Sequence, residues 1–284
     1  MKKFEFIASK GDLQNQITKN CTFLSYNDIK TIFRKKDVII NGLRTKQTVF
    51  LSGNEIVTIY YQEKKTPNVP IIYEDDNILI VNKPVNMECT ICDKVYLNSP
   101  CLEDVFAPYF CVHRLDMNTS GLIIMAKNEK VKQEFITLFK ENSVHKNYTA
   151  ICYGNFTTKQ NTLISYAKKV KGTTKIYSQK QPNSVQIKTY YEVMSTNNNL
   201  SLVSIKLFTG YTHQIRAHLS SIGCFVLGDD KYGKKDINNI YKTHRQQLCA
   251  TSLSFSIKQQ SFLSYLNNKS FSISPPFTLS QFTN

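Results

Sequence analysis

The chain has 284 residues, 41% of them hydrophobic, which is enough for one large domain with a full core or for a large and a small one. Its 36 Lys and Arg against 21 Asp and Glu give a formal net charge of +15, so we expect an anionic partner such as RNA, DNA or an acidic membrane surface. No run approaches the roughly 20 apolar residues of a membrane helix, which excludes such a span.

The eight cysteines are scattered, and the N-terminus lacks the long apolar core of a secretory signal. We therefore expect a cytoplasmic protein with reduced thiols. Cys89 and Cys92 have the CxxC spacing of zinc and redox sites, but no second CxxC or HxxxH pair completes a tetrahedral site. The sequence thus predicts no metal site.

The first 62 residues predict a small domain of two helices and a hairpin sheet. Asp12 can cap a short helix to residue 20, and Ser25 opens a capping box for a second helix. Strands are expected around the Asn41-Gly42 turn, at 38–40, 48–50 and 55–61. The second helix should show solvent a basic face, formed by Lys30, Arg34, Lys35 and Lys36.

A linker is predicted at residues 63–70, because its prolines and polar residues cannot continue a sheet. The chain is therefore divided into a domain at 1–62, this linker and a larger domain at 71–284. The larger domain opens with two strands that Pro84 stops.

Residues 113–121, His-Arg-Leu-Asp-Met-Asn-Thr-Ser-Gly, are a polar stretch before the apolar run at 122–126. This pattern indicates side chains presented on a loop at a sheet edge, and loops on rigid scaffolds are where chemistry concentrates. The same residue types also form ordinary polar turns before buried strands. The spacing alone leaves both interpretations open.

Helices and strands alternate through the rest of the larger domain. Asn128 can cap a helix to about residue 142, and Thr212 can cap another that Gly223 ends. Strands are expected between them, at 146–154, 186–194 and 200–209. Arg216 falls one residue off the apolar face of the second helix, at the edge of the packed layer. It is well placed there to hold an anion.

The stretch HRLDMNTSGLIIMAKN closely resembles the catalytic signature of the pseudouridine synthases that modify ribosomal and transfer RNA. Further segments resemble motifs of that family, in the family's order, at 71–84, 146–148 and 210–216. The resemblance covers about residues 71–256. It implies an α+β fold with a large mixed, mainly antiparallel sheet flanked by helices.

The resemblance also implies roles for individual residues. Asp116 would be the essential catalytic carboxylate, Arg216 its ion-pair partner and Tyr148 the aromatic ring that stacks on the target base. Arg114 would fill the space that a flipped nucleotide leaves. The other implied RNA contacts in this domain are His113, Lys83 and Lys146.

Some positions depart from the family pattern. Asn86 stands two residues after Pro84 where glycine is usual, and asparagine tolerates the left-handed backbone better than most residues. Tyr211 replaces an arginine and Cys249 a histidine. The segment at 87–111 is shorter than expected, so RNA contacts there are the least transferable.

Residues 10–61 resemble the alpha-L RNA-binding domain of a small-subunit ribosomal protein. This implies a small N-terminal α/β RNA-binding domain whose basic helix contacts phosphates. The alternative is a small structural module with a solvated basic helix.

The resemblance implies isomerisation of uridine in RNA to pseudouridine, with no metal, nucleotide or redox cofactor. The carboxylate would either attack the sugar or abstract a proton from it, and the sequence does not distinguish these routes. Large-subunit ribosomal RNA is the first expected substrate and transfer RNA the second, and we expect a monomer. The competing hypotheses are a non-catalytic RNA-binding protein and a hydrolase with two converging carboxylates.

Overall fold

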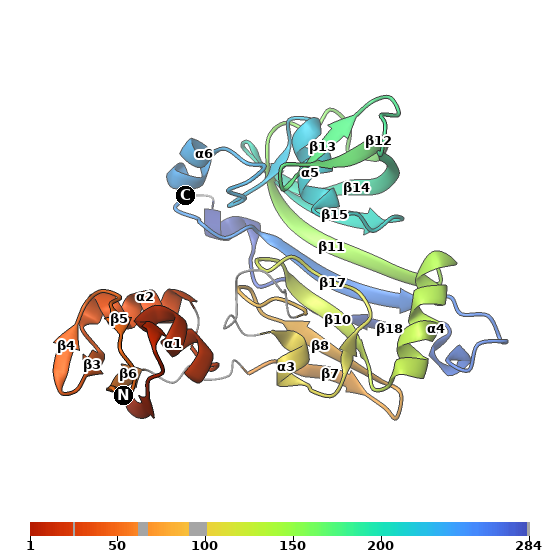
Figure 1. Ribbon diagram of the computed structural model, residues 1–284. Coiled ribbons are helices and arrows are strands. Elements are labelled where there is room, and N and C mark those ends of the chain that lie inside the picture. Colours follow the sequence, from red (N-terminus) through yellow and green to blue (C-terminus); the bar gives the residue numbers. More distant parts are fainter. Residues whose placement is uncertain (25, 62–67, 91–100, 283–284) are drawn as a thin grey trace. The chain divides into compact units, whose positions relative to one another are not determined.

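The computed structural model describes residues 1–24, 26–61, 68–90 and 101–282 (Figure 1). The chain forms two compact units, the smaller from Met1–Asn68 with Thr90–Phe106 and the larger from Val69–Cys89 with Ala107–Asn284. Most of the predicted linker and residue Ser25 of the predicted capping box lie outside the described residues. No helix in the described ranges is long and apolar enough to cross a membrane.

The smaller unit packs two helices against a four-stranded antiparallel sheet. The sheet order is β1 (Lys2–Ile7), β6 (Ile56–Tyr61), β3 (Val38–Ile40) and β4 (Leu43–Thr45), and β2 (Gly11–Asp12) pairs separately with β5 (Phe50–Leu51). The helices are α1 (Leu13–Asn20) and α2 (Tyr26–Lys35), and the short α3 (Leu102–Val105) is grouped with this unit. Apolar side chains of both long helices and of β3 and β6 form its buried core.

Most local predictions for this unit are confirmed. Asp12 caps α1 by accepting a hydrogen bond from the backbone N–H of Asn15 at 3.1 Å. Asn41 turns the β3–β4 hairpin with a φ of 47°. Strand β1 was not predicted; its alternating Phe4 and Phe6 pack against the core while the strand pairs with β6.

The larger unit is organised around one mixed, mainly antiparallel sheet, as predicted. Its central path runs β13-β12-β14-β15-β11-β17-β10-β8-β7, much of which can be followed in Figure 1. Off this path, β16 pairs with β11, β18 with β17 and β9 with β10. The first strands are β7 (Ile71–Glu74), β8 (Ile78–Lys83), β9 (Phe110–Cys111), β10 (Ser120–Ala126) and β11 (Val144–Tyr153). The next are β12 (Gln160–Val170), β13 (Thr173–Tyr177), β14 (Val185–Asn197) and β15 (Leu200–Leu207). The last are β16 (Phe225–Val226), β17 (Leu248–Phe255) and β18 (Ser270–Ser272).

Helices flank this sheet. Helix α4 (Glu129–Lys140) begins at the predicted Asn128 cap, and its apolar face packs on β8, β10 and β17 in the main core. Helix α5 (Gln214–Ser221) lies against β12, β13 and β14. The remaining helical segments are α6 (Lys235–Ile240), η1 (Ser264–Leu266) and η2 (Leu279–Phe282).

Asn86 and His213 are among the residues that adopt a left-handed backbone. Asn86 has a φ of 61°, which agrees with the expectation that asparagine can replace glycine in this turn. The predicted Thr212 cap is wrong, because the N-cap of α5 is His213, which has a φ of 54° and makes no side-chain cap bond. The carbonyl of Thr212 instead accepts a hydrogen bond from the Thr174 hydroxyl at 2.7 Å.

The centre of the sheet depends on a close approach at Gly121. Strands β10 and β17 run parallel there, with Gly121 paired to Ala250, while Tyr148 of β11 pairs with the same Ala250 from the other side. Gly121 has a φ of 118°, and a Cβ on it would collide with the backbone of Ala250. Glycine is therefore required at this position, which directly follows the polar loop.

We predict that Gly121→Ala lowers the free energy of unfolding by about 3 kcal/mol or more, because it adds both a steric collision and backbone strain. Urea denaturation followed by circular dichroism measures this loss. Gly172→Ala is the control, since Gly172 has a φ of 78° but open space around a Cβ, and strain alone costs about 1–2 kcal/mol. Equal losses in the two variants would contradict the proposed close approach.

Candidate active site

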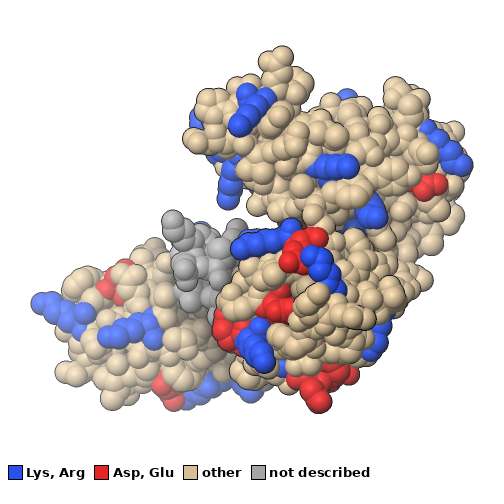
Figure 2. All heavy atoms as spheres, turned by 90° about the vertical axis from the view of Figure 1, so that its right-hand side faces the viewer, with Lys and Arg blue, Asp and Glu red and all other residues tan. Residues whose placement is uncertain are grey.

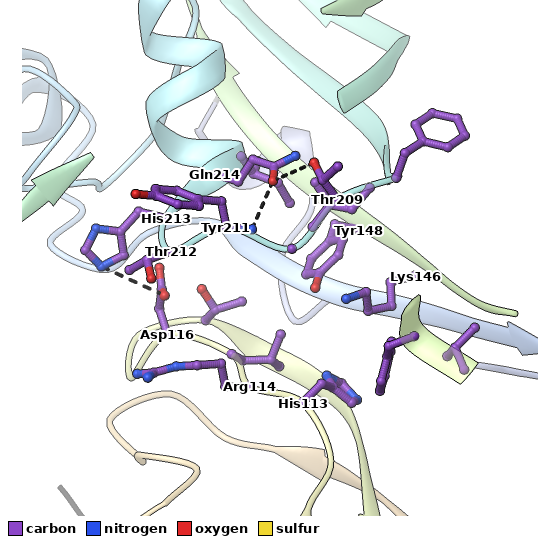
Figure 3. A pocket seen from close by; sticks show the side chains of 18 of the residues that line it. His113, Arg114, Asp116, Lys146, Tyr148, Thr209, Tyr211, Thr212, His213 and Gln214 are labelled. Atoms are coloured by element: carbon purple, nitrogen blue, oxygen red, sulfur yellow. Dashed lines mark hydrogen bonds and ion pairs between the residues drawn. The ribbon is translucent and has the colours of Figure 1, made fainter. Parts of the chain in front are cut away.

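A cleft of about 670 Å³ lies in the larger unit, and three chain segments converge on it. They are the loop before β10, the stretch from α4 into β11, and the connection from β15 into α5. Figure 3 shows Asp116, Tyr148 and His213 reaching into this space from those different elements. Of the predicted residues, the structure brings Asp116, Arg216, Tyr148, His113, Arg114 and Lys146 to this cleft.

Arg216 connects two carboxylates. Its Nη1 donates to Asp116 Oδ2 at 2.7 Å, while Nε and Nη2 donate to the two carboxylate oxygens of Asp229 at 2.6 and 2.9 Å. The Asp229 side chain is fully buried, whereas that of Asp116 is 20% exposed. Asp229 therefore fixes the guanidinium in two-point geometry, and the third donor is directed at the carboxylate that faces the cleft.

Burial and ion pairing together determine the charges of Arg216 and Asp229. Burial alone would lower the pKa of Arg216, but the hydrogen bonds and charges of Asp229 and Asp116 outweigh it and raise that pKa. Burial would likewise raise the pKa of Asp229, but the bonded guanidinium and the N–H groups of Lys231 and Tyr232 lower it. Arg216 and Asp229 thus form an ionised pair under the cleft.

The loop that carries Asp116 is held from below by Lys83. This side chain is fully buried, and its Nζ donates to the carbonyls of Pro84, Met87 and Met117 at 2.9, 2.8 and 3.2 Å. Burial lowers the pKa of Lys83 to about 8. Lys83 was expected to contact RNA, but the structure places it in the interior, where it ties the end of β8 to the loop.

Two further contacts fix the same loop. The sulfur of Cys89 accepts from the N–H of Leu115 at 3.2 Å and donates to the Leu115 carbonyl at 3.4 Å. The Gln246 amide donates to the hydroxyl of Thr119. The backbone on both sides of Asp116 is therefore bonded to other parts of the unit.

Tyr148 lies on β11 with its side chain buried, and it points into the cleft (Figure 3). Burial, together with the charge of Asp116, raises its pKa, so the phenol is neutral. The register between β11 and β17 shifts at this point, because Asn147 pairs with Ser252 and Tyr148 with Ala250, which leaves Thr251 of β17 as an extra residue. Bulges re-aim side chains next to functional sites.

His113 and Lys146 lie together against Phe139 at another part of the cleft. Lys146 Nζ is 4.9 Å from the centre of the Phe139 ring, and the His113 ring is 5.5 Å from it. His113 Nε2 accepts from the N–H of Ile124 at 3.0 Å, so its proton is on Nδ1, which is buried without a partner among the described residues. Burial lowers the pKa of His113 to about 3 and also lowers the pKa of Lys146.

The remaining predicted RNA contacts are exposed. Arg114 lies at the cleft with its side chain in solvent. The basic residues of α2 and its C-terminal end belong to the smaller unit and are exposed, namely Lys30, Arg34, Lys35 and Lys36.

Two residues of this site, Asp229 and His213, were not predicted from the sequence. Asp229, the bidentate partner of Arg216, follows the apolar run Phe225–Leu227 and a glycine. The signal that could have identified it is an acidic residue soon after a buried segment. His213 lies with its Nε2 3.9 Å from Asp116 Oδ1. Nothing in the spacing of the sequence indicated that contact.

No group of three His, Cys, Asp or Glu side chains that could hold a metal occurs within the described ranges. Cys92, the second residue of the CxxC pair, lies outside them. Cys89 is buried and bonded to Leu115, so the described half of that motif supports the signature loop.

Comparisons with known proteins agree with this architecture. Among solved structures, human RNA pseudouridylate synthase domain containing 1 superposes with a TM-score of 0.57 at 25% identity, covering 78% of this chain and 95% of that chain. The model of the RNA pseudouridylate synthase family matches residues 77–221, which include Asp116, Tyr148 and Arg216. The chain belongs to the RNA pseudouridylate synthase family, as its sequence motifs predicted.

Individual relatives also point to the RNA pseudouridylate synthase family. The chain is 36% identical over 201 residues to ribosomal large subunit pseudouridine synthase C of Rickettsia conorii, a match that covers 68% of this chain and 66% of that protein. It is 34% identical over 203 residues to an uncharacterized RNA pseudouridine synthase of Haemophilus influenzae, covering 70% of this chain and 84% of that protein. The match thus spans about two thirds of the Rickettsia protein.

We predict that Asp229→Asn lowers the free energy of unfolding at neutral pH by about 3–5 kcal/mol, because it leaves Arg216 buried without its main counter-charge. The folded-state pKa of Asp229 is lowered, so its stabilisation is present above the ordinary Asp value near 3.9 and is lost as pH falls through the lowered pKa. The difference between variant and wild type should therefore shrink below about pH 4. Urea denaturation at several pH values measures it.

Asp230→Asn is the matched control, since Asp230 is the exposed neighbour of Asp229. It removes the same charge without touching Arg216, and we expect a change within about 0.5 kcal/mol. If Asp229→Asn were as mild as this control, the anchoring of Arg216 by Asp229 would be refuted.

Proposed function

We propose that this protein isomerises uridine in RNA to pseudouridine, with Asp116 as the catalytic carboxylate. The observation that carries the proposal is the placement of Asp116 in the cleft beside a guanidinium that Asp229 holds in place. Among the described residues that line the cleft, Asp116 is the only carboxylate. This argues against the hydrolase hypothesis, which needs a second carboxylate facing the substrate.

The arrangement suits a reaction that begins with one ionised carboxylate close to the nucleoside. Arg216 donates to Oδ2 of Asp116 at 2.7 Å, whereas Oδ1 lies 3.9 Å from His213 Nε2. In our proposal Oδ1 meets the ribose, either as nucleophile at the sugar or as base toward one of its protons. Cleavage of the bond between the sugar and N1 of uracil then frees the base to turn. C5 forms the new bond to the sugar and loses its proton, and N1 takes up a proton, so the product is an isomer of the substrate.

The target uridine must leave its base stack to reach this cleft, which costs a few kcal/mol. The neutral ring of Tyr148 supplies an aromatic face against which the uracil can stack. Arg114, exposed at the cleft, is our candidate for the side chain that fills the vacated space. The Lys146 ammonium is a donor at the same cleft that can contact the RNA, whereas His113 lines the cleft with its Nδ1–H buried.

We propose large-subunit ribosomal RNA as the first substrate, because relatives such as the Rickettsia conorii protein are described as acting there. Transfer RNA is the alternative. The net charge of +15 suits either polyanion, and Figure 2 shows Lys and Arg side chains at several separate places on one face of the molecule. An RNA substrate of this kind also fits our expectation of a cytoplasmic protein.

We further propose that the smaller unit is an RNA-binding domain of the alpha-L type, with its division from the catalytic domain in the 63–70 linker. The proposal is supported by two helices followed by strands of a small antiparallel sheet, to which β1 adds a strand before the helices. The exposed charges on α2 then provide phosphate contacts that do not depend on the RNA sequence.

We predict that Asp116→Asn abolishes pseudouridine formation while the fold and most of the RNA affinity remain, because it removes the charge and little volume. Chemical mapping of pseudouridine in total RNA from cells that carry only the variant measures this, with Asp76→Asn, an exposed turn residue, as control. Arg216→Lys should also be severely impaired, since lysine cannot bind two carboxylates in planar geometry.

The same mapping tests the substrate. A pseudouridine missing from large-subunit ribosomal RNA in the Asp116→Asn cells is the expected result. A loss confined to transfer RNA would refute our substrate assignment, and normal modification in both RNAs would refute the role of Asp116.

We predict that the fourfold variant Lys30→Gln, Arg34→Gln, Lys35→Gln, Lys36→Gln weakens RNA binding across sequences. Each lost phosphate contact should flatten the slope of log affinity against log salt by roughly 0.9 for duplex or 0.7 for single strands. Binding titrations at several salt concentrations measure the slope. The control removes four other exposed lysines of the same unit, Lys2, Lys3, Lys10 and Lys19; an equal slope in both variants would contradict a phosphate-binding role for α2.

A further inference from the structure

His213 has a strained backbone at the edge of the cleft. Its φ of 54° and ψ of 25° are left-handed, a conformation that costs a residue with a side chain roughly 1–2 kcal/mol. Glycine would avoid that cost. Strain of this kind persists where the surrounding structure holds it, and it clusters at functional sites. The position of the His213 ring is therefore a feature that needs a physical explanation.

A chain of hydrogen bonds sets the tautomer of His213. The backbone N–H of Thr174 donates to the Tyr232 hydroxyl at 2.7 Å, and that hydroxyl is 2.9 Å from His213 Nδ1. The Thr174 N–H takes one acceptor position of the hydroxyl, and among the described residues Nδ1 is the acceptor within reach of the hydroxyl proton, so we assign the hydroxyl as donor to Nδ1. A neutral His213 ring then carries its proton on Nε2. Burial lowers the pKa of His213 and so favours the neutral ring.

The Nε2–H faces Oδ1 of Asp116 across a gap. The two atoms are 3.9 Å apart (Figure 3), beyond a direct hydrogen bond, which ends near 3.2 Å. Oδ2 of the same carboxylate is bound by Arg216 at 2.7 Å. The cleft thus offers an acceptor, Oδ1, beside a fixed neutral donor, Nε2–H, and a hydroxyl group can bond to both at once.

We propose that His213 is a substrate-binding residue whose Nε2–H donates to the 2′-hydroxyl oxygen of the target uridine, with Asp116 Oδ1 on the other side of that hydroxyl. This inference rests on the proposed function, which brings the ribose to Asp116. Of the ribose hydroxyls, the 2′-hydroxyl is the one next to the carbon whose bond to the base is broken. The 2′-hydroxyl also distinguishes RNA from DNA, so His213 makes the site selective for ribose.

The matched variants are His213→Met and His213→Gln, which have unbranched side chains of similar length and differ in the donor. They are compared on two RNA stem-loops that contain the mapped target uridine, one natural and one with a single 2′-deoxyuridine at that position. Single-turnover rate and affinity are measured for both. On the natural RNA we expect His213→Met to lose about tenfold or more in rate or affinity, and His213→Gln to recover much of it.

The deoxy stem-loop gives the decisive comparison. Wild type should have a lower rate or affinity with the deoxy RNA than with the natural RNA. His213→Met should have nearly equal rates and affinities with the two RNAs, because it lacks the donor to the 2′-hydroxyl. If the deoxy RNA is not turned over, discrimination is measured as the ratio of the affinities of each protein for the natural and the deoxy RNA. A His213→Met variant that keeps wild-type discrimination overturns the inference, even when its activity is low, because low activity alone would follow from a disturbed fold.

Nitrogen-15 NMR of the imidazoles in the free full-length protein tests the tautomer independently of activity. The His213 signals are assigned by their loss in His213→Met, and we expect protonation on Nε2 that becomes mixed in Tyr232→Phe. Protonation on Nδ1 in wild type overturns the inference. A wild-type protein that modifies no RNA would overturn the proposed function and the ribose contact together, whereas active wild type with unaltered discrimination in His213→Met overturns only the contact.

Discussion

The site depends on the contact of one guanidinium with two carboxylates of different exposure. Asp229 is fully buried and takes two donors of Arg216, which leaves Nη1 directed at Asp116. A buried ion pair of this kind contributes little net stability, but it gives a charged group a fixed direction. Asp116 can therefore remain partly exposed to the cleft and still have a defined orientation, because its partner is anchored elsewhere.

The sheet supplies the frame for this contact. Strand β17 lies between β10 and β11, and its Ala250 is paired with Gly121 on one side and with Tyr148 on the other. The loop of Asp116 and the ring of Tyr148 are thus fixed relative to the same backbone segment. Lys83 and Cys89 add bonds to that loop without reaching the substrate space.

The sequence predicted what depends on local pattern and on motif likeness. The caps at Asp12 and Asn128 and the left-handed Asn86 follow from side-chain chemistry within a few residues. Other features depend on which segments meet in space. They are the pairing of Arg216 with Asp229, the burial of Lys83 and the gap between His213 and Asp116. Periodicity carries no information about such long-range contacts, and the His213 turn even opposes the local rule that placed a cap at Thr212.

The parallel pairing of β10 with β17 also has a consequence for the synthesis of the chain. Asp116 precedes its partner Arg216 by 100 residues, and Gln246, which bonds to Thr119 of the same loop, comes 127 residues after that threonine. A growing chain that has not yet reached β17 lacks the strand that lies between β10 and β11, even when Arg216 has already been made. The complete frame of the site therefore requires β17 to be inserted between two strands that precede it in the sequence, and such non-local pairing is slow to form.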